Sequence, residues 1–299
     1  NWDMTGGSDP WYMKRVVDYI LANNAHLIFD ADRSYPIGGI NPRPPIFTWS
    51  IAVVATLLEP FFSNGDAVWW AILSLPAIYG AFTILPVAYI AREHVNEKAA
   101  VVAAWLIAFM PAHVSHTTWA LADHDAFIML FITLGFMFWL CAVKYAGSER
   151  LLRSSSPSAL SFINAFTAVT QERRAALSAA VLAGVSFGIV SLGWKGFVVG
   201  PSIIFLAYAA QVALNMFRRR DSTTLNVLFL TMLAVNFLMA LPFYGHPQID
   251  LMLDGTGLQP FLFIVIFTVA ISFVTTGFRA KPWLLVLGVL AGTGTIFFM

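Results

Sequence analysis

The chain has 299 residues, of which 59% are hydrophobic and only 11% are charged, and its formal net charge is +1. Long apolar runs in such a chain favour helices in a lipid bilayer over a soluble core, and the absence of a basic cluster interleaved with aromatic residues argues against a nucleic-acid partner. The one cysteine, Cys141, excludes a disulfide bond within the chain.

The first 45 residues are polar and are punctuated by proline and glycine. They contain the acidic motif Asp9-Pro10-Trp11-Tyr12 and end in Pro42-Arg43-Pro44-Pro45. The apolar stretch 46–62 that follows contains Glu59-Pro60 and is only marginally long enough to cross a membrane.

Seven further segments are long and apolar enough to cross a bilayer. They are 67–90, 99–115, 126–143, 176–193, 197–216, 225–243 and 259–278, and an eighth, 284–299, runs to the last residue. Cytoplasmic loops of membrane proteins carry an excess of Lys and Arg, which orients the spans. With these spans, twelve basic residues fall on one side, which is therefore predicted to be cytoplasmic: Arg92, Lys98, Lys144, Arg150, Arg153, Arg173, Arg174, Arg218, Arg219, Arg220, Arg279 and Lys281.

A second acidic motif, Asp123-His124-Asp125, precedes the span at 126–143 on the opposite, outer side. Asp9 can share that side only if 46–62 does not cross, so we expect 46–62 to be a helix that lies in or dips into the outer leaflet. Every aspartate except Asp221 then falls outside, which indicates where the chemistry takes place. The segment 146–175 is expected to be a cytoplasmic loop with a short surface helix.

Carboxylates are costly in a chain of this kind, and three of its 16 acidic residues lie in the two short motifs. Asp123 and Asp125 are separated by one residue, so in an extended or turn backbone both can face one cation while His124 points away. Ligands that offer only oxygen suit Mg²⁺ or Mn²⁺ better than zinc. A solvated turn is the alternative interpretation of this motif.

Three cationic or ionisable residues on the outer side each allow two interpretations. His116 lies seven residues before Asp123 and could have a functional role, as a phosphate contact or a supplementary metal ligand, or could simply form hydrogen bonds at the membrane boundary. Lys195, in the turn Trp194-Lys195-Gly196, could bind a lipid phosphate or extend its ammonium group to the interface. The same choice applies to Arg43.

Taken in order, these motifs resemble the catalytic subunit of oligosaccharyltransferase, and its archaeal single-subunit form in particular. The resemblance rests on Gly7-Ser8-Asp9-Pro10-Trp11-Tyr12, Tyr35-Pro36-Ile37-Gly38, Arg43-Pro44-Pro45-Ile46-Phe47, Asp123-His124-Asp125 and Gly193-Trp194-Lys195-Gly196-Phe197. In the last motif, a lysine replaces a glycine of the family's Trp-Gly-Gly-type turn.

The resemblance implies an all-α, polytopic transmembrane helical bundle with a long first external loop, of the GT-C glycosyltransferase architecture. Residues 1–66 would form the external loop with a non-spanning apolar helix, and residues 67–299 would form the bundle. The family's first transmembrane helix and soluble C-terminal domain would lie outside this chain, which is therefore expected to be inactive alone. The enzyme would be a multi-pass protein of the cell membrane with its active site on the external face.

The resemblance also implies the reaction: an oligosaccharide passes from a dolichyl phosphate or diphosphate carrier to the Asn of an Asn-x-Ser/Thr sequon in an acceptor polypeptide. A Mn²⁺ or Mg²⁺ ion would act as a Lewis acid on the leaving phosphate. Asp9 and Asp123 are assigned to this metal, and Asp125 either completes its ligand shell or holds the acceptor amide. These three are the expected catalytic residues, while His116, Lys195 and Arg43 are expected to contact the lipid phosphate.

Two other functions are compatible with the sequence. One is a different membrane glycosyltransferase that uses a lipid-phosphate sugar and a lipid, glycan or hydroxyl acceptor. The other is a cation-coupled transporter, although acidic motifs at the membrane boundary and the absence of an inverted repeat argue against it.

Overall fold

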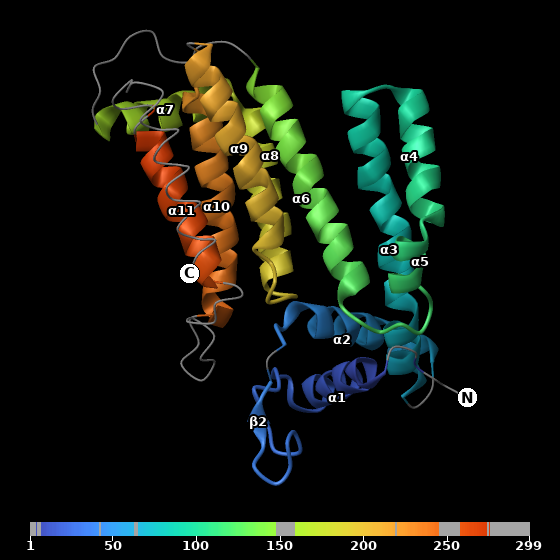
Figure 1. The fold of residues 1–299 in the computed structure, drawn as a ribbon. Coiled ribbons are helices and arrows are strands. Elements are labelled where there is room, and N and C mark those ends of the chain that lie inside the picture. The colour runs from blue at the N-terminus through green and yellow to red at the C-terminus, as the bar shows by residue number, and fades with distance from the viewer. Residues whose placement is uncertain are drawn as a thin grey trace.

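The structure is a computed structural model that describes residues 4, 7–41, 43–62, 65–147, 159–218, 220–244, 258–273 and 275. Helices account for most of this part of the chain, as the sequence predicts (Figure 1). Within it, five helices are long and apolar enough to cross a membrane: α3 (Asp66–His94), α6 (Asp125–Ala146), α8 (Arg174–Ser191), α9 (Val199–Phe217) and α10 (Thr223–Tyr244). The predicted all-α helical bundle is therefore confirmed.

The prediction of a single helix over 99–115 is wrong. The chain forms α4 (Glu97–Phe109) and then α5 (Pro111–His116), with Met110 between them in an extended conformation at φ −64° and ψ 120°. Pro111 causes the break, because proline lacks a backbone N–H and disfavours the α region for the residue before it. Within the described residues, the last helix is α11 (Leu258–Phe273), which begins where the span at 259–278 was expected. The eighth segment, 284–299, lies outside the described residues.

Two helices lie across one end of the bundle instead of running along it (Figure 1). They are α1 (Ser8–Asn23) and α2 (Ile46–Leu58), and the short 3-10 helix η1 (Glu59–Phe61) follows α2. The first turn of α2 is attached to the bundle, because the Ile46 N–H donates to the Leu192 carbonyl at the end of α8 over 2.9 Å. We refer to this end of the molecule as the α2 end.

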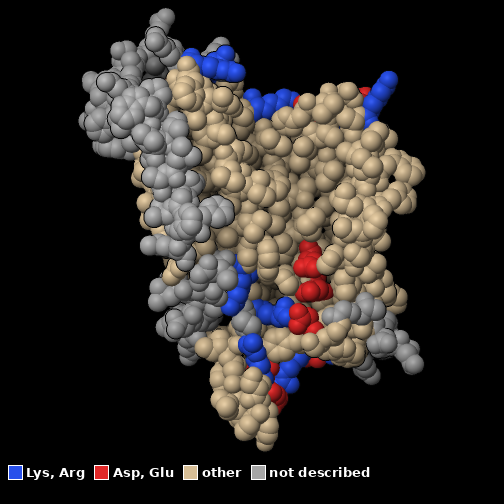
Figure 2. Space-filling view, viewed as in Figure 1, with Lys and Arg blue, Asp and Glu red and all other residues tan. Residues whose placement is uncertain are grey.

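Charged residues gather at the two ends of the molecule, with a band of other residues between them (Figure 2). The end opposite the α2 end carries α7 (Ala159–Glu172), which lies across the bundle within the segment expected to hold a surface helix (Figure 1). Arg92 at the end of α3, Lys144 at the end of α6 and Arg174 at the start of α8 all belong to this α7 end. Arg150, Arg153, Arg219, Arg279 and Lys281 lie outside the described residues.

Small residues bring α8 close to its neighbours in the bundle. A Cβ atom added to Gly184 would lie 2.7 Å from the Met232 carbonyl oxygen of α10, which is too close for any other residue type without a backbone shift. Close backbone approach of this kind is typical of helices that pack in membranes.

The segment between α1 and α2 contains a short antiparallel hairpin of β1 (Phe29–Asp30) and β2 (Gly39–Ile40). Asp30 is buried, and the Arg15 guanidinium of α1 binds both of its carboxylate oxygens, over 2.8 and 3.0 Å. These hydrogen bonds from Arg15 hold the pKa of Asp30 below its ordinary value despite burial. The ion pair therefore joins the hairpin to α1.

Helix α1 also contacts the first turns of α3. The Trp11 ring packs edge-on against the Trp69 ring with 5.8 Å between their centroids, and the Lys14 ammonium lies 5.0 Å from the centroid of the same ring. Trp69 thus receives an aromatic contact and a cation–π contact from α1.

Candidate functional site

The second acidic motif lies at the first turn of α6, at the α2 end of the bundle. Asp125 is the first residue of the helix, where the positive end of the helix dipole stabilises a carboxylate. The loop before it is attached to α3, because the Ala120 N–H donates to the Leu73 carbonyl over 3.0 Å. His113 of α5 donates from Nε2 to the Gly80 carbonyl over 3.2 Å. The motif is therefore positioned by contacts with α3.

Asp123, His124 and Asp125 form a candidate metal site. Each offers one ligand atom, these atoms lie within 4.8 Å of one another, and all three residues are partly buried. Carboxylates suit Mg²⁺ and Mn²⁺, and an imidazole also suits zinc and other transition metals. The donor set of this chain therefore fits a divalent metal ion.

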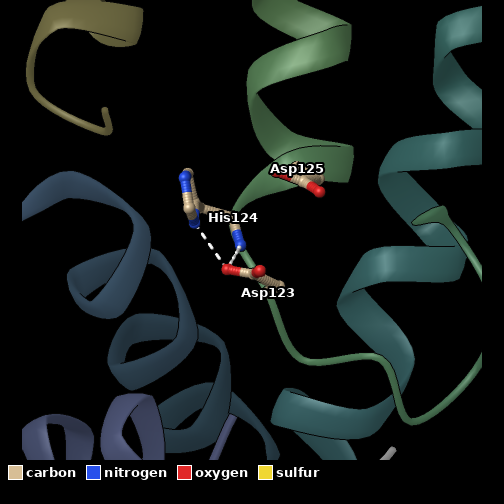
Figure 3. Close-up of side chains that lie close together, drawn as sticks. All are labelled: Asp123, His124 and Asp125. Carbon is tan, nitrogen blue, oxygen red and sulfur yellow. Dashed lines mark hydrogen bonds and ion pairs between the residues drawn. The ribbon is translucent and has the colours of Figure 1, made fainter. Parts of the chain in front are cut away.

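The expected orientation of His124 is wrong. Its Nδ1 atom contacts Asp123 Oδ1, and its backbone N–H donates to the same oxygen over 2.7 Å (Figure 3). Alternation of side chains holds for an extended backbone, whereas His124 has φ −71° and ψ −11°, a helical conformation. At this turn before α6, the imidazole therefore reaches the carboxylate of the preceding residue.

Asp123 is ionised at neutral pH. Its burial favours the neutral acid, but the hydrogen bonds from His124 and the positive charge of Arg43 outweigh burial and hold the pKa below its ordinary value. A carboxylate must be deprotonated to bind a metal ion, so this environment suits a ligand.

His116, the last residue of α5, lies beside the same motif. Its Nδ1 atom is 2.7 Å from Asp125 Oδ2, and both side chains are exposed enough to meet a ligand from outside. His116 and Asp125 therefore come together, which brings the residue expected as a phosphate contact or supplementary ligand to the second acidic motif.

The positive charge of Arg43 interacts with an aspartate of each acidic motif. Its Nη2 atom lies 2.7 Å from Asp9 Oδ1 in the first turn of α1, and its charge also acts on Asp123. Asp9 is not a member of the close group formed by Asp123, His124 and Asp125. Its role as a metal ligand stays a prediction.

Lys195 lies in the turn between α8 and α9, and it is half-buried. This turn follows Leu192, whose carbonyl accepts the Ile46 N–H at the start of α2. A Cβ atom on Gly196 would lie 2.4 Å from the Trp194 ring, so the turn requires glycine at that position. The turn that carries Lys195 and the segment that carries Arg43 are thus attached at neighbouring points.

Two residues that the sequence does not single out, Asn41 and His26, contact the backbone of Arg43. The Asn41 Oδ1 atom accepts the Arg43 backbone N–H over 3.0 Å, and His26 Nε2 lies 3.3 Å from the Arg43 carbonyl oxygen. An asparagine before a proline is common in turns, so the sequence offers no signal that would single out Asn41.

The family model described as "Oligosaccharyl transferase STT3, N-terminal" matches residues 3–290 of the chain. A similar curated protein is dolichyl-phosphooligosaccharide-protein glycotransferase 3 of Archaeoglobus fulgidus, which is 26% identical over 246 residues, or 81% of this chain and 26% of the relative. The dolichyl-monophosphooligosaccharide–protein glycotransferase AglB of Haloferax volcanii is 24% identical over 244 residues, or 79% of this chain and 22% of the relative. The chain thus spans about a quarter of the length of these relatives.

Solved structures of the oligosaccharyltransferase of Archaeoglobus fulgidus have a similar fold. The complex with an inhibitory peptide and a dolichol-phosphate has a TM-score of 0.76 at 22% identity, covering 99% of this chain and 34% of that one. The complex with Zn and sulfate has a TM-score of 0.76 at 23% identity, covering 100% of this chain and 37% of that one. The helical bundle and the helices across its end therefore belong to a known membrane-enzyme fold.

Proposed function

Because the chain belongs to the oligosaccharyl transferase STT3 family, we propose that it is the N-terminal membrane part of an enzyme that N-glycosylates proteins. The enzyme transfers an oligosaccharide from a dolichyl phosphate or diphosphate carrier to the Asn of Asn-x-Ser/Thr sequons. The observation that carries this proposal is the family match over residues 3–290, which includes both acidic motifs. The relatives' names, dolichyl-phosphooligosaccharide and dolichyl-monophosphooligosaccharide glycotransferases, support the lipid-linked donor.

The donor set at the start of α6 supports a metal-assisted reaction. Asp123, His124 and Asp125 would hold Mn²⁺ or Mg²⁺, and Asp9 would be a further ligand from α1. When bound, the ion would stabilise the negative charge that develops on the leaving phosphate. Asp125 either completes this ligand shell or accepts a hydrogen bond from the acceptor amide, whose delocalised lone pair makes it a poor nucleophile.

Three side chains would bind the phosphate of the donor. The Arg43 guanidinium can form two parallel hydrogen bonds to phosphate oxygens, which suits it to this role. Lys195 would add a positive charge from the turn between α8 and α9, and His116 would donate a hydrogen bond from the end of α5. Their elements meet at the α2 end of the bundle (Figure 1), and we propose that the lipid-linked donor and the acceptor bind there.

We expect the full-length enzyme, supplied with a lipid-linked oligosaccharide, to glycosylate a peptide that contains an Asn-x-Ser/Thr sequon. A matched peptide with Gln in place of the acceptor Asn should remain unmodified. Transfer of the sugar to a lipid or hydroxyl acceptor instead would identify another glycosyltransferase of this architecture. Ion uptake into proteoliposomes without transfer would identify a cation-coupled transporter.

We also propose that residues 1–66 form an external segment and residues 67–299 a bundle whose α7 end faces the cytoplasm. Helices α1 and α2 support this division, because they lie across the bundle (Figure 1). The basic residues at the opposite end support the orientation, since they are typical of cytoplasmic loops.

Cysteine labelling can test this orientation in intact cells. Ile37 is 84% exposed between β1 and β2, and Val95 is 68% exposed after α3. On a Cys141→Ala background, an impermeant maleimide should label Ile37→Cys from outside and Val95→Cys only after permeabilisation. Labelling of both from outside would contradict the proposed orientation and the cytoplasmic assignment of the α7 end.

A further inference from the structure

Asn41 is a buried asparagine directly after β2, with 2% of its surface exposed. Its backbone N–H donates to the Ile28 carbonyl over 2.7 Å, and its side-chain Nδ2 donates to the Leu27 carbonyl over 2.9 Å. Its Oδ1 atom accepts the Arg43 N–H over 3.0 Å. The asparagine therefore bonds on one side to the segment that leads into β1 and on the other side to Arg43.

His26 holds the other side of the Arg43 residue. In the Nε2–H tautomer, His26 donates to the Arg43 carbonyl over 3.3 Å, and the same nitrogen lies 3.4 Å from Asn41 Nδ2. The imidazole is largely buried, and burial lowers the pKa of His26, which keeps the ring neutral. Asn41 thus holds the Arg43 amide while His26 holds its carbonyl.

The side chain of Arg43 makes a separate contact. Its guanidinium binds Asp9 over 2.7 Å and is 21% exposed. The chain beyond Arg43 is fixed as well, because Ile46 bonds to Leu192 of the bundle. The backbone of Arg43 is thus held on both sides, and its charge lies within the field of Asp9 and Asp123.

We propose that Asn41, supported by His26, is a positioning residue that aims the Arg43 guanidinium between the two acidic motifs, where it meets the donor phosphate. The proposal rests on the proposed function. Asparagine suits the position because one side chain must accept from the Arg43 N–H and donate to the Leu27 carbonyl. An aspartate would place an acceptor opposite that carbonyl, and alanine would make neither bond.

The reactivity of Arg43 toward phenylglyoxal tests the positioning without any transfer assay. In the full-length protein, Asn41→Ala should raise the rate of Arg43 modification about fivefold, as measured by mass spectrometry, because a freed guanidinium leaves Asp9 more often. Arg92, which is 51% exposed at the α7 end, serves as the internal reference and should not change. Asn23→Ala removes an exposed asparagine at the end of α1, and it is the matched control. An unchanged Arg43 rate would overturn the proposal.

A double-mutant cycle tests the consequence for the reaction. Asn41→Ala should raise the KM for the lipid-linked donor about tenfold with little change in kcat, because it removes the two side-chain hydrogen bonds of Asn41, each of ordinary strength. On an Arg43→Ala background, the same substitution should change KM less than twofold, because the residue that it positions is gone. Equal effects on both backgrounds would mean a general structural role and would contradict the proposal.

The two measurements separate this proposal from the proposed function. A full-length protein that transfers no glycan to a peptide contradicts the proposed function. The rates of phenylglyoxal modification still test the positioning role of Asn41 in that case. If Asn41→Ala does not fold, His26→Ala provides the same test, since it removes the contact to the Arg43 carbonyl and the 3.4 Å contact to Asn41 Nδ2 but leaves the Asn41 bonds to Arg43 and Leu27 in place. A rise in Arg43 reactivity of about twofold is then expected for one lost hydrogen bond of a weaker kind, and no rise would overturn the proposal.

Discussion

Replacement of Asp123 by alanine in the full-length enzyme is expected to lower the rate of glycan transfer by two to three decades. Asp123 belongs to the candidate metal site, is ionised at neutral pH and lies in the field of Arg43. Loss of one electrostatic contact to a transition state typically costs roughly 3–4 kcal/mol, which corresponds to this loss of rate. The measurement is the initial transfer rate to a sequon peptide, in membranes with matched expression.

Asp18→Ala is the matched control for Asp123→Ala. Asp18 is an exposed carboxylate of α1 that pairs with Lys14 at the surface, and an exposed ion pair contributes little to stability. Its replacement should leave the transfer rate within twofold. His124→Asn should fall between the two, because the imidazole contacts Asp123 and offers a possible ligand atom. If Asp123→Ala retained half of the wild-type rate, the second acidic motif could not be the centre of the reaction.

Chelation by EDTA is expected to abolish transfer in the full-length enzyme, and added Mn²⁺ or Mg²⁺ should restore it. Asp123, Asp125 and the proposed ligand Asp9 offer hard carboxylate oxygens, which these two ions prefer. The comparison is the transfer rate in EDTA, in EDTA followed by excess Mn²⁺ or Mg²⁺, and in untreated membranes.

Two further measurements sharpen the chelation experiment. Zn²⁺ should be tested beside Mn²⁺ and Mg²⁺, because His124 adds a nitrogen atom to the donor set. A calcium-selective chelator such as EGTA, with excess Mg²⁺ present, is the control for effects of chelation on the membrane itself. Full activity in EDTA would contradict the metal-assisted reaction and leave the acidic motifs as groups that bind the acceptor.

The helical bundle could be predicted from the sequence because apolar length is a direct physical requirement of a membrane span. The same criterion failed at 99–115, since mean hydropathy takes no account of the hydrogen bond that Pro111 removes. The position of the break could have been predicted from Pro111 itself, because proline favours the first turn of a helix.

The candidate site was predictable only where its residues are chemically unusual. Asp9, Asp123 and Asp125 stand out because carboxylates are rare in this chain. Asn41 and His26 do not stand out, because their importance arises from contacts that the hairpin creates between distant positions. The direction of His124 depends on one pair of backbone angles, which residue spacing does not determine.

The two acidic motifs are both attached to helix α3. Trp69 of α3 carries α1 and with it Asp9, and Leu73, one helical turn further along α3, holds the loop that leads to Asp123. If α3 tilts to match a thicker or thinner bilayer, Trp69 and Leu73 move together because they belong to the same helix. The spacing between the motifs therefore depends on two attachment points that lie a single helical turn apart on α3.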